Sequence, residues 1–436
     1  MPEKPQPFTV MVKPVGSHCN LRCSYCYYLE TERPTAPLQQ ARMTDELLEL
    51  FIRQYIEASQ GPEVSIVWHG GEPSLAGLDF YRRAVQLQQK YLPEGWVCWN
   101  NLQTNGVLLD EQWCSFLAEA NFDVGLSIDG TREQHDRYRR DARGEGSYAS
   151  VIESAQRLKA HGIRPDLLCT VTSSTAKDAL AAYRALRELE SGWMQFIPIV
   201  RQEAAASQAI TNPNGNGQLS AASVTSDSIG SAEYGEFLCT VFDEWVLHDL
   251  GRLDVQMFAE TARVWAGGSA GLCWMAETCG RALIVEVDGG VYSCDHFVTP
   301  EHRIGDLATT NLAELAELPA QLLFGERKQS SLPSQCRRCE WLEFCNGGCP
   351  KDRFLLSEDG EPGLNYLCAG FKRFFSYARP FMDELTRLRK QGINASTIMA
   401  NLQELKRKQW QGVGRNDPCP CGSGLKAKNC CWLRRA

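Results

Sequence analysis

The chain has 436 residues, of which 22% are charged, and its formal net charge is −8. A single hydrophobic core rarely grows beyond about 250–300 residues, so this length indicates at least two domains. The modest acidic charge argues against a nucleic-acid partner, no segment approaches the roughly 18 apolar residues of a membrane span, and the N-terminus lacks a signal-peptide pattern.

We therefore expect a soluble, cytoplasmic protein. In a reducing compartment its nineteen cysteines are better suited to metal binding than to disulfides. Most of them fall into tight clusters, which supports this interpretation. The four scattered ones are predicted to be small buried apolar residues: Cys98, Cys114, Cys169 and Cys239.

Short apolar runs alternate with helical patterns over the first 199 residues. The predicted strands are residues 8–15, 64–69, 97–104, 122–128, 164–171 and 194–199. The intervening helices include 44–59, with Thr44 as its N-cap, and 147–161, which ends before Gly162. Six such alternations predict a parallel sheet, curved or barrel-like, with ligands bound at the carboxyl ends of the strands.

The rest of the chain divides into segments of different composition. Residues 202–232 are small and polar without periodicity, which predicts a mobile loop. An amphipathic helix over about 232–250 comes next, and a cysteine-dense region then runs from Cys273 to Cys368. Residues 380–410 are charged and helical in pattern, and a short cysteine module closes the chain at 414–432.

Three cysteines directly after the first predicted strand have the spacing C-x3-C-x2-C: Cys19, Cys23 and Cys26. Three thiolates can hold a [4Fe–4S] cube and leave its fourth iron open to a substrate or cofactor. A three-cysteine zinc site and chance clustering are the alternatives. The triplet resembles the S-adenosylmethionine (SAM) site of the radical SAM superfamily, which implies a partial (β/α)6 barrel and SAM cleavage to a 5′-deoxyadenosyl radical.

Further strand-end motifs support this resemblance. In WHGGEP (68–73) the glycines let the backbone approach a ligand closely, and the run resembles the superfamily's GGEP motif. The motifs QTNG (103–106) and SIDG (127–130) end the next two strands, and Arg139 follows, although its charge-rich segment can equally be a solvated helix start. The SAM-binding residues that the resemblance implies are Tyr25, Gly70, Gly71, Glu72, Asn105, Ser127, Asp129 and Arg139.

Eight more cysteines are enough for two fully ligated cubes, although C-x2-C pairs are also typical of zinc ribbons. Their order resembles the SPASM extension of radical SAM enzymes. That resemblance assigns one auxiliary cluster to Cys273, Cys279, Cys294 and Cys349, and the other to Cys336, Cys339, Cys345 and Cys368. A cube with four thiolates has no substrate position, so electron transfer is its expected work.

Four segments resemble the anaerobic sulfatase-maturating enzymes more specifically: QFIP (195–198), FDEWV (242–246), ETCGRAL (277–283) and YSCDHFV (292–298). That family oxidises a cysteine or serine of a sulfatase to Cα-formylglycine without oxygen, and its catalytic base corresponds to Asp295. A turn residue or a hydrogen-bond acceptor for the loop is the alternative role for Asp295, and a core aromatic is the alternative for Tyr28, a possible pocket residue. His69 departs from the family pattern, which has glutamine before GGEP.

The C-terminal run NDPCPCGSGLKAKNCCW (416–432) is too short to form a core, so a tetrahedral zinc would supply its folding energy. It resembles the SEC-C motif, whose ligands correspond to Cys419, Cys421, Cys430 and Cys431. The motif is locally basic because of Lys426, Lys428, Arg434 and Arg435, which suggests a docking role. A purely structural role is the alternative. We expect it to be mobile relative to the catalytic body.

The predicted architecture is α/β, with a radical SAM core at 1–232, a SPASM domain at 233–390, a helical connector at 391–413 and a zinc tail at 414–436. The expected cofactors are three [4Fe–4S] clusters, SAM and Zn²⁺. The expected partners are an unfolded or nascent sulfatase and a flavodoxin- or ferredoxin-type electron donor. Alternatives are a SPASM maturase that crosslinks a ribosomally made peptide, and a non-catalytic metal scaffold, for which an open iron would have no use.

Overall fold

The computed structural model describes residues 5–30, 42–203 and 224–432, which form two compact units. The first unit comprises residues 1–128, 132–168 and 278–330, and the second comprises 129–131, 169–277 and 331–436. These units cut the chain differently from the predicted domains, because 278–330 returns to the first unit. The predicted boundaries stay a prediction, and residues 204–223 of the predicted loop, with Arg434 and Arg435, lie outside the described residues.

A mostly parallel sheet organises the first unit, in the order β10-β9-β8-β1-β2-β3-β4-β5. Its strands are β1 (Thr9–Val12), β2 (Glu63–Trp68), β3 (Val97–Thr104), β4 (Phe122–Ser127), β5 (Asp166–Val171), β8 (Ala282–Val285), β9 (Gly290–Tyr292) and β10 (Arg303–Asp306). β8 pairs parallel to β1, and β9 pairs antiparallel to both of its neighbours, β8 and β10. The register aligns Val12 with Trp68 and Trp68 with Leu102, so the carboxyl ends of β1, β2 and β3 meet at one edge.

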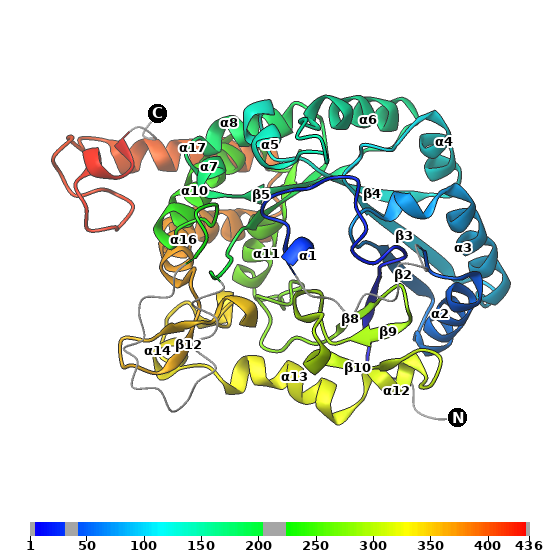
Figure 1. Cartoon of the computed structure of the whole chain (residues 1–436). Coiled ribbons are helices and arrows are strands. Elements are labelled where there is room, and N and C mark those ends of the chain that lie inside the picture. Colours follow the sequence, from blue (N-terminus) through cyan, green and yellow to red (C-terminus); the bar gives the residue numbers. More distant parts are fainter. Residues whose placement is uncertain (1–4, 31–41, 204–223, 433–436) are drawn as a thin grey trace. The chain divides into compact units, whose positions relative to one another are not determined.

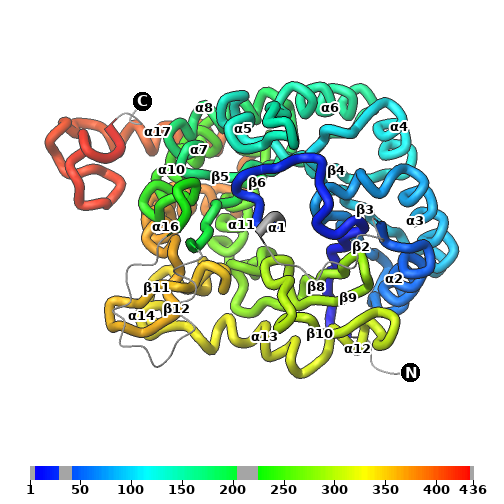
Figure 2. The backbone as a smooth tube through the Cα atoms, viewed as in Figure 1, coloured from blue at the N-terminus to red at the C-terminus, as the bar shows by residue number. Residues whose placement is uncertain are grey.

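Helices follow the strands of this sheet and lie along its outer side (Figures 1 and 2). They are α2 (Asp45–Ala58), α3 (Leu78–Tyr91), α4 (Glu111–Glu119), α5 (Arg132–Tyr138) and α6 (Tyr148–Ala160), with α12 (Leu312–Ala316) and α13 (Pro319–Ser330) near the end of the unit. The Thr44 side chain accepts a hydrogen bond from the Leu47 amide, which is the predicted N-cap. Short elements complete the unit: α1 (Tyr27–Glu30), η1 (Pro73–Ala76), η3 (Asp295–Phe297) and η4 (Pro300–His302).

The core of the first unit lies between the sheet and these helices. Val10, Val12, Ile66 and Leu102 from the strands are completely buried against helix residues such as Phe51. This packing of apolar strand residues under an amphipathic helical layer holds the strand ends, and hence the loops that follow them, in fixed positions.

The second unit is mainly helical. Its longer elements are α8 (Ala179–Arg187), β6 (Trp193–Pro198), α10 (Ser231–Glu244), α11 (Gln256–Trp265), α16 (Cys368–Lys390) and α17 (Ala395–Trp410), and β7 is the two-residue strand Asp254–Val255. Its shorter ones are α7 (Ser173–Ala176), the π-helical η2 (Trp245–Asp249), α14 (Ser334–Arg337), α15 (Leu342–Cys345), η5 (Pro350–Asp352), β11 (Leu355–Leu356), β12 (Pro362–Leu364) and η6 (Ala427–Asn429). Gly235 on α10 lies against Gly370 on α16, where a Cβ at Gly235 would come within 2.9 Å of the Gly370 Cα.

The structure confirms the α/β fold class and the six predicted strands, whose ends shift by at most a few residues. The helix predicted over 232–250 is α-helical to Glu244 and then widens into a π-helical turn. The predicted connector contains α17, which is packed rather than free, because Ile398, Leu402 and Lys406 are buried. Of the scattered cysteines, Cys114, Cys169 and Cys239 are buried as predicted, and Cys98 is half-buried. Among the described residues, no helix combines the length and apolar character needed to cross a bilayer.

Candidate functional site

The cysteine triplet lies on the loop between β1 and α1. Cys23 is buried, and Cys19 and Cys26 are partly buried. The Leu21 amide donates to the Cys19 sulfur at 3.3 Å, and the Cys26 amide donates to the Cys23 carbonyl at 3.0 Å. Burial raises the pKa of the Cys19 thiol to about 11. A buried thiol of this kind ionises readily only when a metal replaces its proton, which suits a cluster ligand.

The WHGGEP loop closes directly over the cysteine loop. The Gly71 amide donates to the Gly16 carbonyl, and the Glu72 amide donates to the His18 carbonyl, both at 2.8 Å. A Cβ on Gly71 would overlap the His18 carbonyl, so only glycine permits this approach. The motif therefore brings backbone, rather than side chains, next to the triplet.

Glu72 is a fully buried carboxylate whose oxygens bind several protein donors. One oxygen accepts from the Ser74 amide, the Ser74 hydroxyl and the Thr104 hydroxyl, and the other accepts from the Asn105 amide at 2.7 Å. Burial raises its pKa, and these hydrogen bonds oppose the rise. Glu72 thus braces the GGEP loop against the end of β3, and its predicted contact with SAM stays a prediction.

Other predicted SAM-site residues also meet the cysteine loop. The Asn105 side chain donates to the Asn20 side chain at 2.7 Å and lies 3.7 Å from the Cys19 sulfur. The Arg139 guanidinium lies 5.6 Å from the ring centre of Tyr25. The Ser127 hydroxyl accepts a hydrogen bond from the Gln103 side chain at 3.1 Å. Asp129 belongs to the second unit, where its carboxylate accepts from the Thr170 amide at 2.8 Å.

Asp295, in η3 directly after Cys294, is the centre of a polar cluster in the first unit. Its carboxylate is 2.7 Å from the Lys13 ammonium, accepts from the Tyr28 hydroxyl at 2.7 Å, and accepts from the Tyr27 hydroxyl. Lys13 is completely buried and also pairs with Glu286 at 3.3 Å. Residues from two segments that are far from Asp295 in the sequence therefore converge on its carboxylate, which a simple turn residue would not require.

The pKa values of Asp295, Tyr27 and Tyr28 follow from their burial and from the charges around them. Burial alone would raise the pKa of Asp295, but the Lys13 ammonium, with His69 and His296, holds it well below its usual range. Together these neighbouring charges outweigh the desolvation, so Asp295 is a weaker base than burial alone would make it. Burial and the charge of Asp295 raise the pKa values of Tyr27 and Tyr28 well above normal, so both hydroxyls keep their protons and act as donors.

Sequence reasoning identified Asp295 and Tyr28 but missed the other members of the cluster. Lys13 lies among the apolar residues of the first predicted strand, and a lysine at such a buried position was the available signal. Glu286, which directly follows the strand β8 that pairs beside β1, gave no local signal. His69, noted only as a departure, lies with its Nδ1 2.7 Å from the Gly70 amide and 3.3 Å from the Tyr28 hydroxyl.

The auxiliary-cluster cysteines are distributed over both units. Of the first predicted set, Cys279 and Cys294 belong to the first unit, and Cys273 and Cys349 belong to the second. Burial raises the pKa of Cys349 to about 12. The grouping of these four cysteines stays a prediction.

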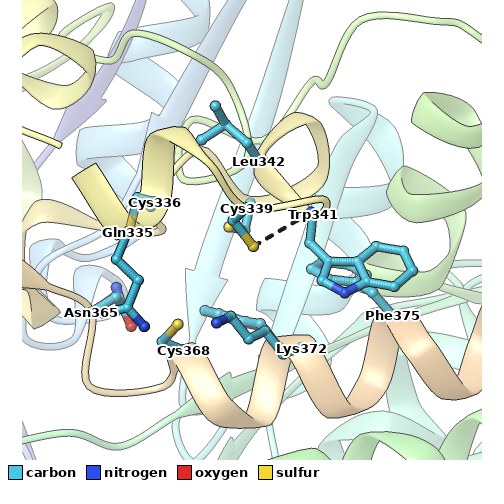
Figure 3. A pocket seen from close by; sticks show the side chains of 12 residues that line it. Gln335, Cys336, Cys339, Trp341, Leu342, Asn365, Cys368, Lys372 and Phe375 are labelled. Atoms are coloured by element: carbon cyan, nitrogen blue, oxygen red, sulfur yellow. Dashed lines mark hydrogen bonds between the residues drawn. The ribbon is translucent and has the colours of Figure 1, made fainter. Parts of the chain in front are cut away.

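The second predicted set lines one pocket within the second unit: Cys336, Cys339, Cys345 and Cys368. Figure 3 shows Cys336 and Cys339 facing Cys368, which starts α16, with Trp341, Lys372 and Phe375 around them. The Trp341 amide donates to the Cys339 sulfur at 3.4 Å. Burial raises the pKa of Cys345 to about 12 and that of Cys368 to about 11. Four converging soft ligands in an otherwise largely apolar pocket fit a fully ligated iron–sulfur cube.

The four tail cysteines also converge. The sulfurs of Cys419, Cys421, Cys430 and Cys431 all lie within 4.8 Å of one another. Two of the separations are 3.4 Å, between Cys421 and Cys430, and 3.5 Å, between Cys430 and Cys431. A tetrahedral zinc with bonds of 2.3 Å requires sulfurs about 3.8 Å apart, so the set fits zinc with a small expansion.

Three family models match the chain. The radical SAM superfamily matches residues 14–185, an iron–sulfur cluster-binding domain of the SPASM type matches 273–340, and the SEC-C motif matches 415–433. All three were expected from the sequence motifs.

Similar proteins extend over most of the chain. The serine-type anaerobic sulfatase-maturating enzyme of Bacteroides thetaiotaomicron is 42% identical over 383 residues, which cover 87% of this chain and 91% of that enzyme. The cysteine-type enzyme of Clostridium perfringens (strain 13 / Type A) is 32% identical over 86% of this chain and 97% of its own length. A solved structure of native anSMEcpe with bound AdoMet and the Cp18Cys peptide has a TM-score of 0.76 and 31% identity, covering 88% of this chain and 99% of that one.

Proposed function

The chain belongs to the anaerobic sulfatase-maturating enzymes of the radical SAM superfamily, and from this premise we propose how its residues carry out the reaction. It is a radical SAM oxidoreductase that binds [4Fe–4S] clusters and SAM and converts a cysteine or serine of a sulfatase to Cα-formylglycine without oxygen. The roles of single residues, the zinc of the tail and the electron donor are parts of the proposal.

The SAM site of the proposal is built around the cysteine loop. Cys19, Cys23 and Cys26 hold the cluster, and the backbone of Gly70 and Gly71 lines the space beside it. The close approach of this backbone to residues 16–18 supports the assignment. When bound, the cluster and SAM supply a 5′-deoxyadenosyl radical that takes a hydrogen atom from the Cβ of the target residue.

Asp295 is the proposed proton acceptor. After the Cβ hydrogen has left, the target must lose one proton, from its hydroxyl or thiol, and one electron to become C=O or C=S; a thioaldehyde is then hydrolysed to the aldehyde. The observation that carries this proposal is the convergence of Lys13, Tyr27 and Tyr28 on the Asp295 carboxylate, next to the predicted cluster ligand Cys294. They hold the acceptor ionised and oriented before the radical forms.

A carboxylate with a low pKa is sufficient for this step. A hydroxyl or thiol on a carbon that has lost a hydrogen atom is far more acidic than in the intact residue, because the resulting radical anion is delocalised over carbon and the heteroatom. The requirement on the enzyme is therefore an unprotonated carboxylate in position, rather than a strong base. A cluster held by Cys294 would add negative charge beside Asp295 and move its pKa back upward.

The cysteines of the two auxiliary sets are the proposed ligands of clusters that accept the departing electron. Cys294 precedes Asp295, so the proton and the electron leave the substrate on the same side of the site. The converging sulfurs of Cys336, Cys339, Cys345 and Cys368 support the second cluster. A flavodoxin- or ferredoxin-type protein is the proposed external electron donor.

The experiment that tests the proposal is Asp295→Asn in anaerobically reconstituted enzyme, incubated with reductant, SAM and sulfatase peptides containing either cysteine or serine at the target position. We expect 5′-deoxyadenosine to form while formylglycine falls by at least about 100-fold, a typical loss for a positioned acid–base group. Asp306→Asn, the same change at a surface ion pair of the first unit, is the matched control. Normal formylglycine yield by mass spectrometry would remove Asp295 from the mechanism.

Zinc in the tail is a separate part of the proposal. The mutual proximity of the four tail sulfurs supports it. Elemental analysis of the full-length protein and of Cys430→Ser should differ by about one zinc per chain. Equal zinc contents would exclude the site.

A further inference from the structure

One basic side chain outside the tail contacts the tail's four-cysteine site. Arg373 lies on α16, and one nitrogen of its guanidinium, Nη2, is 3.3 Å from the sulfur of Cys430 and 3.3 Å from that of Cys431. Its Nε donates to Glu236 on α10 at 2.8 Å, and its guanidinium carbon lies 5.3 Å from the ring centre of Tyr377. The guanidinium is thus held from one side by the body of the second unit and faces the tail with the other.

The chemistry of this contact favours charged sulfurs. The Arg373 side chain is only 15% exposed, and its Nη1 is buried without a hydrogen-bond partner among the described residues. Neutral thiols are weak acceptors and do not offset the burial of a guanidinium, whereas a zinc ion with four thiolates carries a net charge of −2. The Ser423 hydroxyl also donates to Cys430, at 3.2 Å, so this sulfur has two donors around it.

We propose that Arg373 is a positioning residue for the tail metal site, through which metal binding and docking of the tail on α16 are linked. This inference rests on the proposed zinc site. Metal-bound thiolates accept stronger hydrogen bonds from Arg373 than free thiols do, so occupied sites dock more tightly. By linkage, a docked tail binds zinc more tightly by the same factor.

Apolar residues of α16 and α17 also lie next to the tail. Trp432 of the tail packs at 6.2 Å, edge to face, against Trp410, the last residue of α17. A cavity between α16, the end of α17 and the tail is lined by Tyr377, Phe381, Trp410, Cys421 and Cys431, among others. A docked tail therefore covers apolar side chains of two helices as well as making the polar contact.

Arg373 lies on the same helix as a proposed ligand of the second auxiliary cluster. α16 begins at Cys368, a proposed ligand of the second auxiliary cluster, and Arg373 is five residues further along. At 1.5 Å per residue the two positions are about 7.5 Å apart along the helix axis. The tail site is thus attached to the same rigid element that carries a cluster ligand, rather than to a separate linker.

The test compares full-length, cluster-reconstituted wild type with Arg373→Ala and Arg373→Lys. Arg379→Ala is the matched control, because Arg379 is on the same helix and pairs with Glu340 instead. Zinc affinity is measured by competition with a chromophoric chelator, with Cys430→Ser as the metal-free reference. Hydrogen exchange is then compared with and without zinc for peptides of α16 around 373–381 and for the tail at 415–432.

We expect Arg373→Ala to bind zinc at least about tenfold more weakly, as is typical when a partner of a metal ligand is removed. Arg373→Lys should lie between Arg373→Ala and wild type, because it keeps the charge but loses the forked donor. Zinc should protect the α16 peptide in wild type and Arg379→Ala, and not in Arg373→Ala even at saturating zinc. A structural role for Arg373 alone would not make this protection depend on zinc.

The outcomes separate the two proposals. If wild type holds no more zinc than Cys430→Ser, the zinc site is absent and the inference fails with it. If wild type holds zinc but Arg373→Ala retains its affinity and the zinc-dependent protection of α16, only the docking inference is overturned. If Arg373→Ala does not fold, Arg373→Lys decides, and unchanged affinity and protection in that variant would overturn the inference.

Discussion

Replacing Lys13 by methionine is the most direct test of the charge arrangement around Asp295. Methionine fills a similar volume but removes the ammonium that pairs with two largely buried carboxylates, Asp295 and Glu286, whose side chains are 16% and 10% exposed. The wild-type ion-pair distances are 2.7 Å to Asp295 and 3.3 Å to Glu286.

The expected size of the effect follows from these distances. At an effective dielectric constant of 20, Coulomb's law gives gross attractions of about 6 and about 5 kcal/mol for the two pairs. Burying the ammonium offsets much of this, and removal of one partner from a buried ion pair typically costs about 3–5 kcal/mol. For a unit of roughly 200 residues, this corresponds to a fall in Tm of about 6–20 °C.

Anaerobic calorimetry of the holoenzyme measures this loss. Lys90→Met is the matched control, because Lys90 is 58% exposed in its ion pair with Glu49, and such pairs contribute less than about 1 kcal/mol. The triple variant Lys13→Met, Glu286→Gln, Asp295→Asn should recover most of the lost stability, since no buried charge is then left unpaired. A Lys13→Met protein as stable as Lys90→Met, or a triple variant no more stable than Lys13→Met, would refute the electrostatic reasoning.

Two further predictions address the cysteine loop and the second unit. Gly71→Ala should lose about one [4Fe–4S] cluster by iron and sulfide analysis and should form little 5′-deoxyadenosine, because its Cβ overlaps the His18 carbonyl. The control is Gly95→Ala, whose Cβ meets no atom within 4 Å and which should keep its full iron content. Equal losses of iron in the two variants would contradict the steric argument. Asp243→Ala should lower the free energy of unfolding by about 3–5 kcal/mol, because Asp243 accepts a hydrogen bond from Tyr377 and pairs with the buried Lys406 at 3.3 Å. The control is Glu404→Ala at an exposed ion pair, for which we expect a loss below about 0.5 kcal/mol. An equally small loss in Asp243→Ala would show that the Asp243 network contributes nothing to stability.

The strands and helices of the first unit could be predicted because their residues obey local rules. Alternating or continuous apolar runs mark β1 to β5, and Thr44 with Gly162 mark helix ends. What the sequence did not reveal was long-range pairing. β8 joins the sheet beside β1, more than 260 residues away in sequence, and nothing in the run ALIV at 282–285 specifies that neighbour.

The same distinction applies to the site. Cys19, Cys23 and Cys26 are close in sequence, so their spacing alone indicates their chemistry. The partners of Asp295 come from the residue that follows β1 and from the segment after the triplet, so only the folded chain brings them to Asp295. The contact of Arg373 could not be predicted from the sequence either. Arg373 is one of several arginines on a charged helix, and nothing in its local sequence indicates that it contacts two cysteines almost 60 residues later.

The charge balance around Lys13 explains why a salt-bridged carboxylate can still take a proton. Before the reaction, the buried Lys13 ammonium faces two carboxylates, those of Asp295 and Glu286. When Asp295 accepts a proton, Lys13 and Glu286 remain as an ion pair. Protonation costs the Lys13–Asp295 attraction but removes the repulsion between the two carboxylates and the desolvation penalty of one of them.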